Sequence, residues 1–294
     1  MRIQPSTIKT SELHALLLGA VAPRPICFAS TVDKDGQPNL SPFSFFNIFG
    51  SNPPTLIFSP SRRVRDNTVK HTLENIYATK EVVINVVNYA MVQQTSLASC
   101  EYPAGVSEFE KAGFTPLPSE KIKPFRVNES PVQMECIVKQ VIETGDQGGA
   151  GNLVICEPVM VHINDDILDN KGRIDPHKID LVARMGGDFY CRASGDAVFE
   201  VAKPNTQLGI GVDALPLSIR NSNILTGNCL GQLGNVHEMP VVDPSFSDDH
   251  LKQIIQYYSV TPDEMERELH TYAQKLLRAG KVQEAWQVLL TSLA

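Results

Sequence analysis

One short segment, SPSRRVRDNT at residues 59–68, combines cationic and hydroxyl side chains in a pattern suited to binding an anion. The cations are Arg62, Arg63 and Arg65, and the hydroxyls belong to Ser59, Ser61 and Thr68. The arginines directly precede a predicted helix that Asp66 would cap, and the free N–H groups and dipole of a helix start attract anions. Because arginine donates two hydrogen bonds at once to phosphate oxygens, the segment predicts a phosphate monoester site. A solvated basic loop is the alternative.

The segment NLSPFSFFN at residues 39–47 interleaves hydrogen-bonding and apolar side chains at the end of a predicted strand. The polar members are Asn39, Ser41 and Ser44, and the apolar members are Pro42, Phe43 and Phe45. A flat, amphipathic ring system needs apolar contact on its faces and hydrogen-bond partners at its edges. This segment offers both, although an ordinary strand end can show the same pattern.

The pattern of apolar residues predicts a β-rich organisation up to about residue 195. We expect strands over residues 26–31, 38–45, 55–59, 82–87, 132–144 and 152–163. Helices are expected over 11–19 and from Asp66 to Tyr77, and residues 96–121 read as a long surface segment with short helical pieces. The glycine-rich stretch 145–151 joins two strands and lacks a following helix, so it predicts a hairpin loop and not a phosphate cradle.

Beyond about residue 195 the composition changes. Residues 195–240 are rich in Gly, Asn and Pro, and residues 247–293 carry helical periodicity. Thr261 to Glu264 predicts a capping box with proline at the first helical position. We therefore predict two domains, a β-rich domain over 1–195 and a helical C-terminal extension over 196–294.

The bulk composition narrows the function classes. A net charge of −7 and a pI near 5.5 argue against a nucleic-acid partner. Six cysteines without C-x-x-C spacing predict reduced, mostly buried thiols, and the scattered histidines predict no metal site. No stretch approaches the roughly 20 apolar residues of a membrane span, and the N-terminal segment does not read as a signal peptide. A cytoplasmic location without a membrane partner is expected.

Together these motifs resemble those of the flavin reductase-like family. The matching residues, in chain order, are Arg24-Pro25, Ser30-Thr31, Asp35-Gly36, Asn39 to Ser44, Pro53-Pro54, Arg65-Asp66-Asn67-Thr68 and Asn75-Ile76. Residues 105–114 and 173–192 also resemble family segments, so the likeness covers about residues 10–195. Where relatives often read K-D-T, this chain has an inserted Asn, so either Asn67 or Thr68 takes the place of the family threonine.

The resemblance implies an FMN-binding split barrel, a mainly β fold with helices, followed here by the C-terminal α-helical extension. It also implies noncovalent FMN and a homodimer whose interface helps to build the site. The segment Ser41, Pro42, Phe43 and Ser44 would lie against the isoalloxazine and ribityl chain. The phosphate would be met by Ser59, Ser61, Arg62, Arg65 and Asn67 or Thr68. The remaining expected flavin-binding residues are Ser30, Thr31, Asn39 and Arg184.

The implied reaction is hydride transfer from NADH or NADPH to flavin N5, followed by electron passage to a small acceptor. The flavin carries this chemistry and the protein orients it, so no catalytic acid or base is assigned. The alternatives are a non-catalytic FMN-binding electron carrier and a pyridoxamine phosphate oxidase-like split-barrel enzyme, which would use the same loop for a phosphorylated vitamin.

Overall fold

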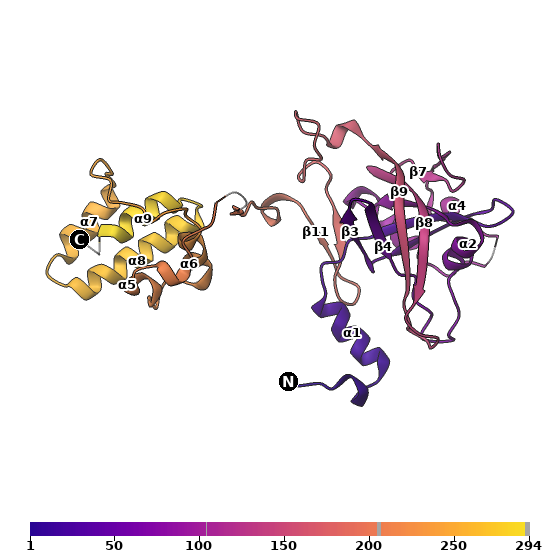
Figure 1. Ribbon diagram of the computed structural model, residues 1–294, viewed down its shortest axis with the longest axis horizontal. Helices are drawn as coiled ribbons and strands as arrows, with labels where there is room; N and C mark the ends of the chain where they lie inside the picture. Colours follow the sequence, from indigo (N-terminus) through magenta and orange to yellow (C-terminus); the bar gives the residue numbers. More distant parts are fainter. Residues whose placement is uncertain (104, 205–206, 292–294) are drawn as a thin grey trace. The chain divides into compact units, whose positions relative to one another are not determined.

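The computed structural model describes residues 1–103, 105–204 and 207–291. The chain divides into two compact units, Met1–Phe199 and Glu200–Ala294 (Figure 1). Each unit buries apolar side chains of its own. Within the described ranges, no helix is long and apolar enough to cross a membrane. The first unit is built on β-sheet and the second is helical, as the sequence predicted.

A seven-stranded antiparallel sheet forms the first unit, in the order β2-β1-β5-β8-β9-β4-β3. Its strands are β1 (Cys27–Val32), β2 (Pro38–Phe43), β3 (Phe46–Ser51), β4 (Pro54–Phe58), β5 (Glu81–Val86), β8 (Val132–Glu143) and β9 (Asn152–Ile163). Only two residues separate β2 from β3, yet these strands stand at opposite edges of the sheet. Because three steps of at most about 3.6 Å join Phe43 to Phe46, the two strand ends lie within about 11 Å, and the sheet must curl until its edges approach, which gives a barrel.

Local chemistry explains the hairpins that the sequence predicted. Between β1 and β2, the Asp33 carboxylate accepts hydrogen bonds from the amides of Asp35 and Gln37, and Gly36 adopts a positive φ of 82°. The stretch 145–151 is the loop of the β8–β9 hairpin, as predicted. Strand β3 was not predicted from the sequence, because its exposed, weakly alternating residues give no period-2 signal.

Short elements complete the first unit. The helices are α1 (Thr10–Ala20), α2 (His71–Thr79), α3 (Val92–Leu97) and α4 (Glu108–Ala112), with 3-10 turns at Pro5–Thr7, Tyr89–Met91, Asp165–Ile167 and Gly195–Ala197. The small two-stranded sheets are β6 (Pro116–Leu117) with β7 (Arg126–Val127) and β10 (Val182–Arg184) with β11 (Tyr190–Arg192). The short helical pieces expected within residues 96–121 are thus confirmed.

The prediction that Asp66 caps a helix was wrong, since α2 begins at His71 with Lys70 as its N-cap. The Asp66 carboxylate instead accepts hydrogen bonds from the amide and the hydroxyl of Thr68, at 3.1 and 2.6 Å. Between them, Asn67 adopts a left-handed conformation with φ of 58°. A left-handed residue interrupts helical geometry, so Asp66 closes a turn and the helix starts later.

Arg24 fastens α1 to the sheet. Its guanidinium is 6% exposed and donates to the carbonyls of Leu18 and Val21 at the end of α1, at 2.5 and 2.6 Å. It also donates to the Met185 carbonyl at 2.9 Å and to the Ser44 hydroxyl at 3.4 Å. A cation at a helix C-terminus is favourable because it meets free carbonyls and the negative end of the dipole.

The cysteines of the first unit follow the expectation of buried thiols. Cys27, Cys136 and Cys156 are fully buried in one cluster of the sheet, and burial raises the pKa of each thiol. All six cysteines are free, and Cys100 is exposed.

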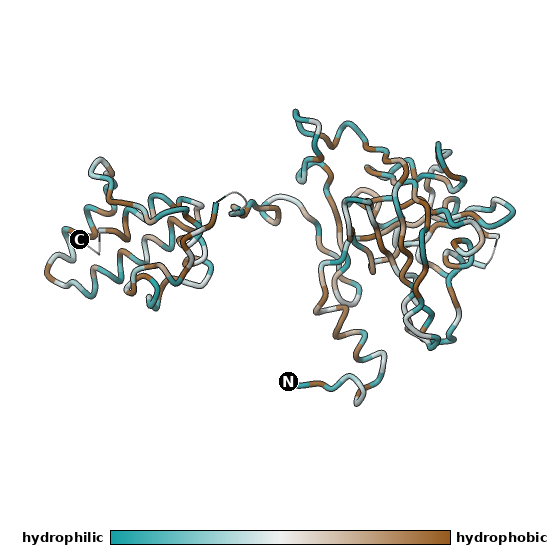
Figure 2. Tube along the Cα trace, in the orientation of Figure 1, coloured by the Kyte–Doolittle hydropathy of each residue, from teal (hydrophilic) through white to brown (hydrophobic). Residues whose placement is uncertain are grey.

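In the second unit, the residues that the structure describes form five α-helices packed around Trp286, which is fully buried. These are α5 (Leu217–Arg220), α6 (Gly227–Gly234), α7 (Asp249–Tyr258), α8 (Pro262–Arg278) and α9 (Val282–Thr291), after a 3-10 turn at Val212–Ala214. Apolar and hydrophilic stretches alternate along them (Figure 2), as expected of helices with one buried face. Helix α8 starts at Pro262 as predicted, but the Thr261 side chain makes no capping-box hydrogen bond; its hydroxyl donates to the Tyr258 carbonyl.

Candidate anion and flavin site

Three cations of the first unit converge on one carboxylate. Arg63 donates to Glu101 at 2.8 Å, Arg65 donates to the same carboxylate at 3.0 Å, and the Lys70 ammonium lies 3.8 Å away. We call Arg63, Arg65 and Lys70 the cation cluster. Hydrogen bonds from the two arginines lower the pKa of Glu101. The carboxylate thus sits where a small anion would find three positive partners.

The members of the cation cluster differ in exposure. The Arg63 side chain is 18% exposed and also donates to the Thr68 hydroxyl and the Val69 carbonyl, so its position is fixed. The Arg65 side chain is 73% exposed and makes its other contact with neighbouring Asp66. Burial, and next the charge of Arg63, lower the pKa of Lys70. Arg63 and Lys70 therefore form the ordered part of the cluster.

A small hollow lies next to the cation cluster. Beside Arg63, Lys70 and Glu101, its walls come from Asn39, Ser41, His71, Thr72, Ser99, Cys100, Tyr102 and Glu108. The remaining space is about 20 Å³, enough for one water molecule. Residues 99–102 form part of its wall, and the hollow as it stands has no room for a ligand larger than water.

Hydrogen bonds join β1, β2 and α2 at the edge of the hollow. The Asn39 amide donates to the hydroxyls of Thr72 at 2.9 Å and Thr31 at 3.3 Å. The buried Asn75 side chain donates to the same Thr31 hydroxyl at 3.1 Å. These bonds set the start of α2 against the first half of β2, two residues before Ser41.

Glu108 closes the hollow from the α4 side. The residue is 6% exposed, and its carboxylate accepts a hydrogen bond at 2.9 Å from the Leu40 amide of edge strand β2. Burial raises the pKa of Glu108. The contact satisfies an edge-strand amide that would otherwise lack a partner.

The predicted arginine-rich loop points in two directions. Arg62 turns away from the cluster and donates to the side chain and the carbonyl of Asn67, at 2.7 and 2.9 Å. The Asn67 amide in turn donates to the Asp146 carbonyl of the β8–β9 loop. A Cβ at Gly148 would lie 3.0 Å from the carbonyls of Arg63 and Val64, so a glycine allows the two loops to meet.

The other predicted flavin-binding residues differ in burial and in their distance from the cation cluster. Ser30 and Thr31 are fully buried, and Phe43 is 8% exposed. The hydroxyl of Ser59 accepts a hydrogen bond from the Asn152 amide, which ties the predicted loop to β9. The structure brings Asn39 and Ser41 to the cation cluster, through the hollow that they share with Arg63 and Lys70.

Four further predicted positions lie apart from the lining of the hollow. Ser44 contacts Arg24, while Pro42 of β2 and Ser61 of the loop after β4 are partly buried. Arg184 stacks on Tyr190 with its guanidinium 4.6 Å from the ring centroid. Arg184 also pairs through its backbone with Arg24, which connects this segment to the end of β2 by way of Ser44.

The donor set of the cation cluster fits a phosphate group. Two guanidinium groups and one ammonium contact the carboxylate of Glu101, and Ser41 and Thr72 line the hollow beside it. A carboxylate and a phosphate accept the same charge-assisted hydrogen bonds from arginine, so Glu101 stands in for the anion. Since the site joins an anion centre to the polar and apolar strand end at Ser41, its chemistry suits a phosphorylated ring compound.

Comparison with known proteins identifies the family. A family model described as "Flavin reductase like domain" matches residues 19–178, all within the first unit. The chain belongs to the flavin reductase-like family. A relative from Aquifex aeolicus is 38% identical over 189 residues, which cover 64% of this chain and 94% of the relative.

Two solved structures resemble the first unit. Nitrilotriacetate monooxygenase component B from Bacillus cereus has a TM-score of 0.64 and 30% identity, and the match covers 68% of this chain and 98% of that protein. A split barrel domain protein from Shewanella frigidimarina has a TM-score of 0.59 and 27% identity, over 69% of this chain and 99% of that protein. The predicted family and the split-barrel fold with an added helical extension are confirmed. At this broad level the protein is a flavin oxidoreductase.

The sequence interpretation counted Arg63 among the cations of the predicted anion-binding segment but did not include it among the expected flavin-binding residues. It missed Lys70, Thr72, Glu101 and Glu108 altogether. One available signal was the family pattern itself. The triplet Lys70-His71-Thr72 is also a variant of K-D-T, and it stands directly before Leu73, Glu74 and the Asn75-Ile76 pair. This reading needs no inserted residue, and it coincides with the true start of α2.

Proposed function

We propose that this flavin reductase-like protein binds FMN and uses it to transfer electrons from NADH or NADPH to a small acceptor. The observation that carries the proposal is the cation cluster, where three positive side chains hold a single carboxylate at the start of α2. A phosphate monoester has three terminal oxygens and a charge of about −1.5 to −2 at neutral pH, so it can accept hydrogen bonds from all three cations. FMN carries such a terminal monoester.

We assign the FMN phosphate to the cation cluster, with the hydroxyls of Ser41 and Thr72 as neutral donors. Of the phosphate-binding residues predicted from the sequence, Arg65 and Thr68 are retained as proposed phosphate contacts. Asn39 and Thr31 hold β2 against α2 and so position these donors. Ser59, Arg62 and Asn67 bond within the protein and fix the loop that carries Arg63.

The strand end from Ser41 to Ser44 is the proposed contact for the ring and ribityl chain. Pro42 and Phe43 offer apolar surface, and the two serine hydroxyls offer hydrogen bonds. Ser61, Arg184 and the buried pair Ser30-Thr31 are proposed as supporting positions around this segment. When bound, FMN supplies hydride-transfer chemistry, and these side chains bind and orient it.

The solved relatives support electron transfer as the activity. One is named as component B of a monooxygenase and the other is described as a flavin reductase. Within the described ranges, the arrangement around the hollow offers binding groups and a single buried carboxyl, Glu108, which is already bonded to a backbone amide. This agrees with an enzyme in which the cofactor performs the chemistry.

The test starts from the purified full chain. The ligand released by denaturation should be FMN by mass, and the reconstituted protein should lose its visible flavin absorbance when NADH or NADPH is added anaerobically. A colourless protein that also fails to bind added FMN would overturn the proposal. Flavin that a nicotinamide does not reduce, but a partner reductase does, would favour the electron carrier. Release of a phosphorylated vitamin would favour the oxidase.

We also propose that the protein is a homodimer. Apolar side chains are exposed on α1 and β3, among them Leu17 at 52%, Ile48 at 64% and Phe49 at 65%. His14 of α1 and Phe45, next to β3, contact each other with ring centroids 6.0 Å apart, so the two surfaces adjoin. Large adjoining apolar side chains favour association. Sedimentation should give a dimer for the wild type and a monomer for Phe49→Glu.

The cytoplasmic location stays a prediction.

A further inference from the structure

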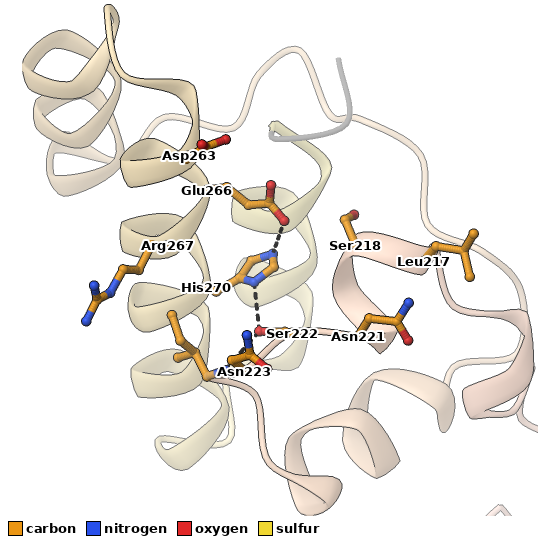
Figure 3. Close-up of a pocket in the computed structure, with 10 residues that line it drawn as sticks. Leu217, Ser218, Asn221, Ser222, Asn223, Asp263, Glu266, Arg267 and His270 are labelled. Carbon is orange, nitrogen blue, oxygen red and sulfur yellow. Dashed lines mark hydrogen bonds and ion pairs between the residues drawn. The ribbon is translucent and has the colours of Figure 1, made fainter.

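The second unit contains a cavity of about 690 Å³ between α5, the loop that follows it and the first half of α8. Figure 3 shows Glu266, His270 and Ser222 joined in a line, with Ser218 of α5 beside them. The cavity lies outside the residues matched by the flavin reductase-like family. Its volume falls within the range of small-molecule sites in proteins.

Hydrogen bonding fixes the tautomer of His270. The Ser222 oxygen accepts two backbone N–H groups, from Ile224 and Leu225, each at 3.2 Å. Its hydroxyl hydrogen is therefore free to donate only to the histidine Nδ1, which lies 2.8 Å away. Because Nδ1 is an acceptor, the neutral ring carries its hydrogen on Nε2. Burial lowers the pKa of His270 and so favours this neutral form.

Two buried polar groups of the cavity then lack hydrogen-bond partners among the described residues. His270 is 2% exposed, and its Nε2 makes no hydrogen bond. A Glu266 carboxylate oxygen lies 3.9 Å away, which is too far for a hydrogen bond. The buried hydroxyl of Ser218 also has no partner. An unsatisfied buried donor is costly, so both groups favour a ligand that supplies the missing partner.

The charges around His270 select the kind of partner. An anion could accept from the Nε2 hydrogen, but it would meet the Glu266 carboxylate, while Arg267 points away (Figure 3). A cation could pair with Glu266, but it could not accept from Nε2. A hydroxyl accepts from Nε2 and donates to the carboxylate at the same time, and it can do so with Ser218 as well.

We propose that this cavity binds a neutral polyhydroxylated small molecule, a sugar or a polyol, with one hydroxyl between His270 and Glu266. The side-chain amides of Asn221 and Asn223 at the cavity wall supply paired donors and acceptors for further hydroxyls. Anchoring the loop to α8 explains why His270 bonds to Ser222. It does not explain why Nε2 and Ser218 are left without partners in the same cavity.

The first measurement is the protonation state of His270 in the full chain. Long-range ¹H–¹⁵N spectra at neutral pH should show a neutral ring with its hydrogen on Nε2. A ring that carries its hydrogen on Nδ1 alone, or on both nitrogens, would overturn the proposal. In either case His270 would not be the neutral ring with an unpaired Nε2–H donor on which the proposal depends. This readout does not depend on the identity of the ligand.

The second measurement uses D-ribose and D-glucose as probes, with acetate and ethylammonium as charged comparators. At least one sugar should shift the His270 Nε2 resonance in a saturable way. Glu266→Gln, which exchanges a charge-assisted hydrogen bond for a neutral one, should weaken that binding by about fivefold. Glu264→Gln removes the same charge from α8 outside the cavity lining and should leave the binding unchanged.

Two results would overturn the proposal. One is the absence of any saturable shift with either sugar, which would leave only water as the partner of His270. The other is binding of acetate or ethylammonium in place of the sugars, which would show that charge, and not paired donation and acceptance, selects the ligand.

Discussion

The carboxylate of Glu101 occupies the cation cluster, so its replacement by glutamine should tighten FMN binding. Glu101 accepts hydrogen bonds from Arg63 at 2.8 Å and from Arg65 at 3.0 Å. A phosphate that uses these guanidinium groups must first separate them from Glu101. The apparent affinity is therefore reduced by the fraction of molecules in which the cluster is free. Glutamine keeps the length of the side chain and removes its charge, so that fraction rises.

The size of the effect follows from the exposure of the partners. The side chains of Arg63, Arg65 and Glu101 are 18%, 73% and 43% exposed, which places these contacts between buried and fully solvated ion pairs. An exposed ion pair changes an equilibrium constant by a factor of about 1.5 to 5. Loss of two pairs thus predicts an FMN Kd lower by about 2- to 25-fold. The gain should shrink at high ionic strength, because salt screens exposed charges.

The assay is fluorescence titration of FMN with the apoprotein, repeated with riboflavin, which has the same ring and no phosphate. Glu101→Gln should lower the Kd of FMN and leave that of riboflavin nearly unchanged. Glu110→Gln, an equal charge change at an exposed position on α4, is the matched control. An FMN Kd equal to or higher than that of the wild type would refute the reasoning. So would an equal decrease for riboflavin.

Three further predictions concern the arginines of the cation cluster, the buried carboxyl of Glu108 and the core of the second unit. Arg63→Ala should raise the FMN Kd by about tenfold or more, and Arg65→Ala by less in the same titration, because Arg63 is held by more partners. Burial raises the folded-state pKa of Glu108 above 4.5, so its contribution to stability is complete below 4.5 and is lost as pH rises through the raised value. Glu108→Gln, which can still accept from Leu40, should therefore increase the free energy of unfolding more at neutral pH than at pH 4.5 in urea titrations. Trp286→Ala should cost the second unit about 3–5 kcal/mol in thermal unfolding and leave the FMN Kd unchanged.

The fold was predictable where one local signal dominates. The alternation along β8 and β9, the continuous apolar run of β5 and the Asp33 to Gly36 turn each specify their structure within a few residues. Strand β3 has no such signal, since it forms at an edge through pairing with β4 and has few buried residues. Tertiary pairing, which no local pattern encodes, decides such a segment.

The position of α2 shows how two plausible local signals can compete. Asp66 is a good helix cap by type, and Val69, Leu73 and Ile76 have helical spacing behind it. However, an aspartate forms a turn with a residue two places on as readily as it caps a helix. The left-handed Asn67 shows that the turn prevails. The helix therefore starts at His71, with Lys70 as its N-cap.

The choice between Arg62 and Arg63 could not be made from the sequence at all. The two arginines are adjacent, and the segment around them has no regular period that would assign them to opposite sides. Their directions are set by the β8–β9 loop, whose backbone pairs with Arg62 at Ala150 and Gly149, and whose Asp146 carbonyl holds Asn67. That loop lies more than eighty residues further along the chain, so Arg62 is bonded there and Arg63 is left to meet Glu101. The glycine-rich stretch rejected as a phosphate cradle is thus what aims an arginine at the proposed phosphate site. A bulkier residue at Gly148, which approaches the Arg63 carbonyl to 3.0 Å, should disturb this aim without touching any proposed ligand contact.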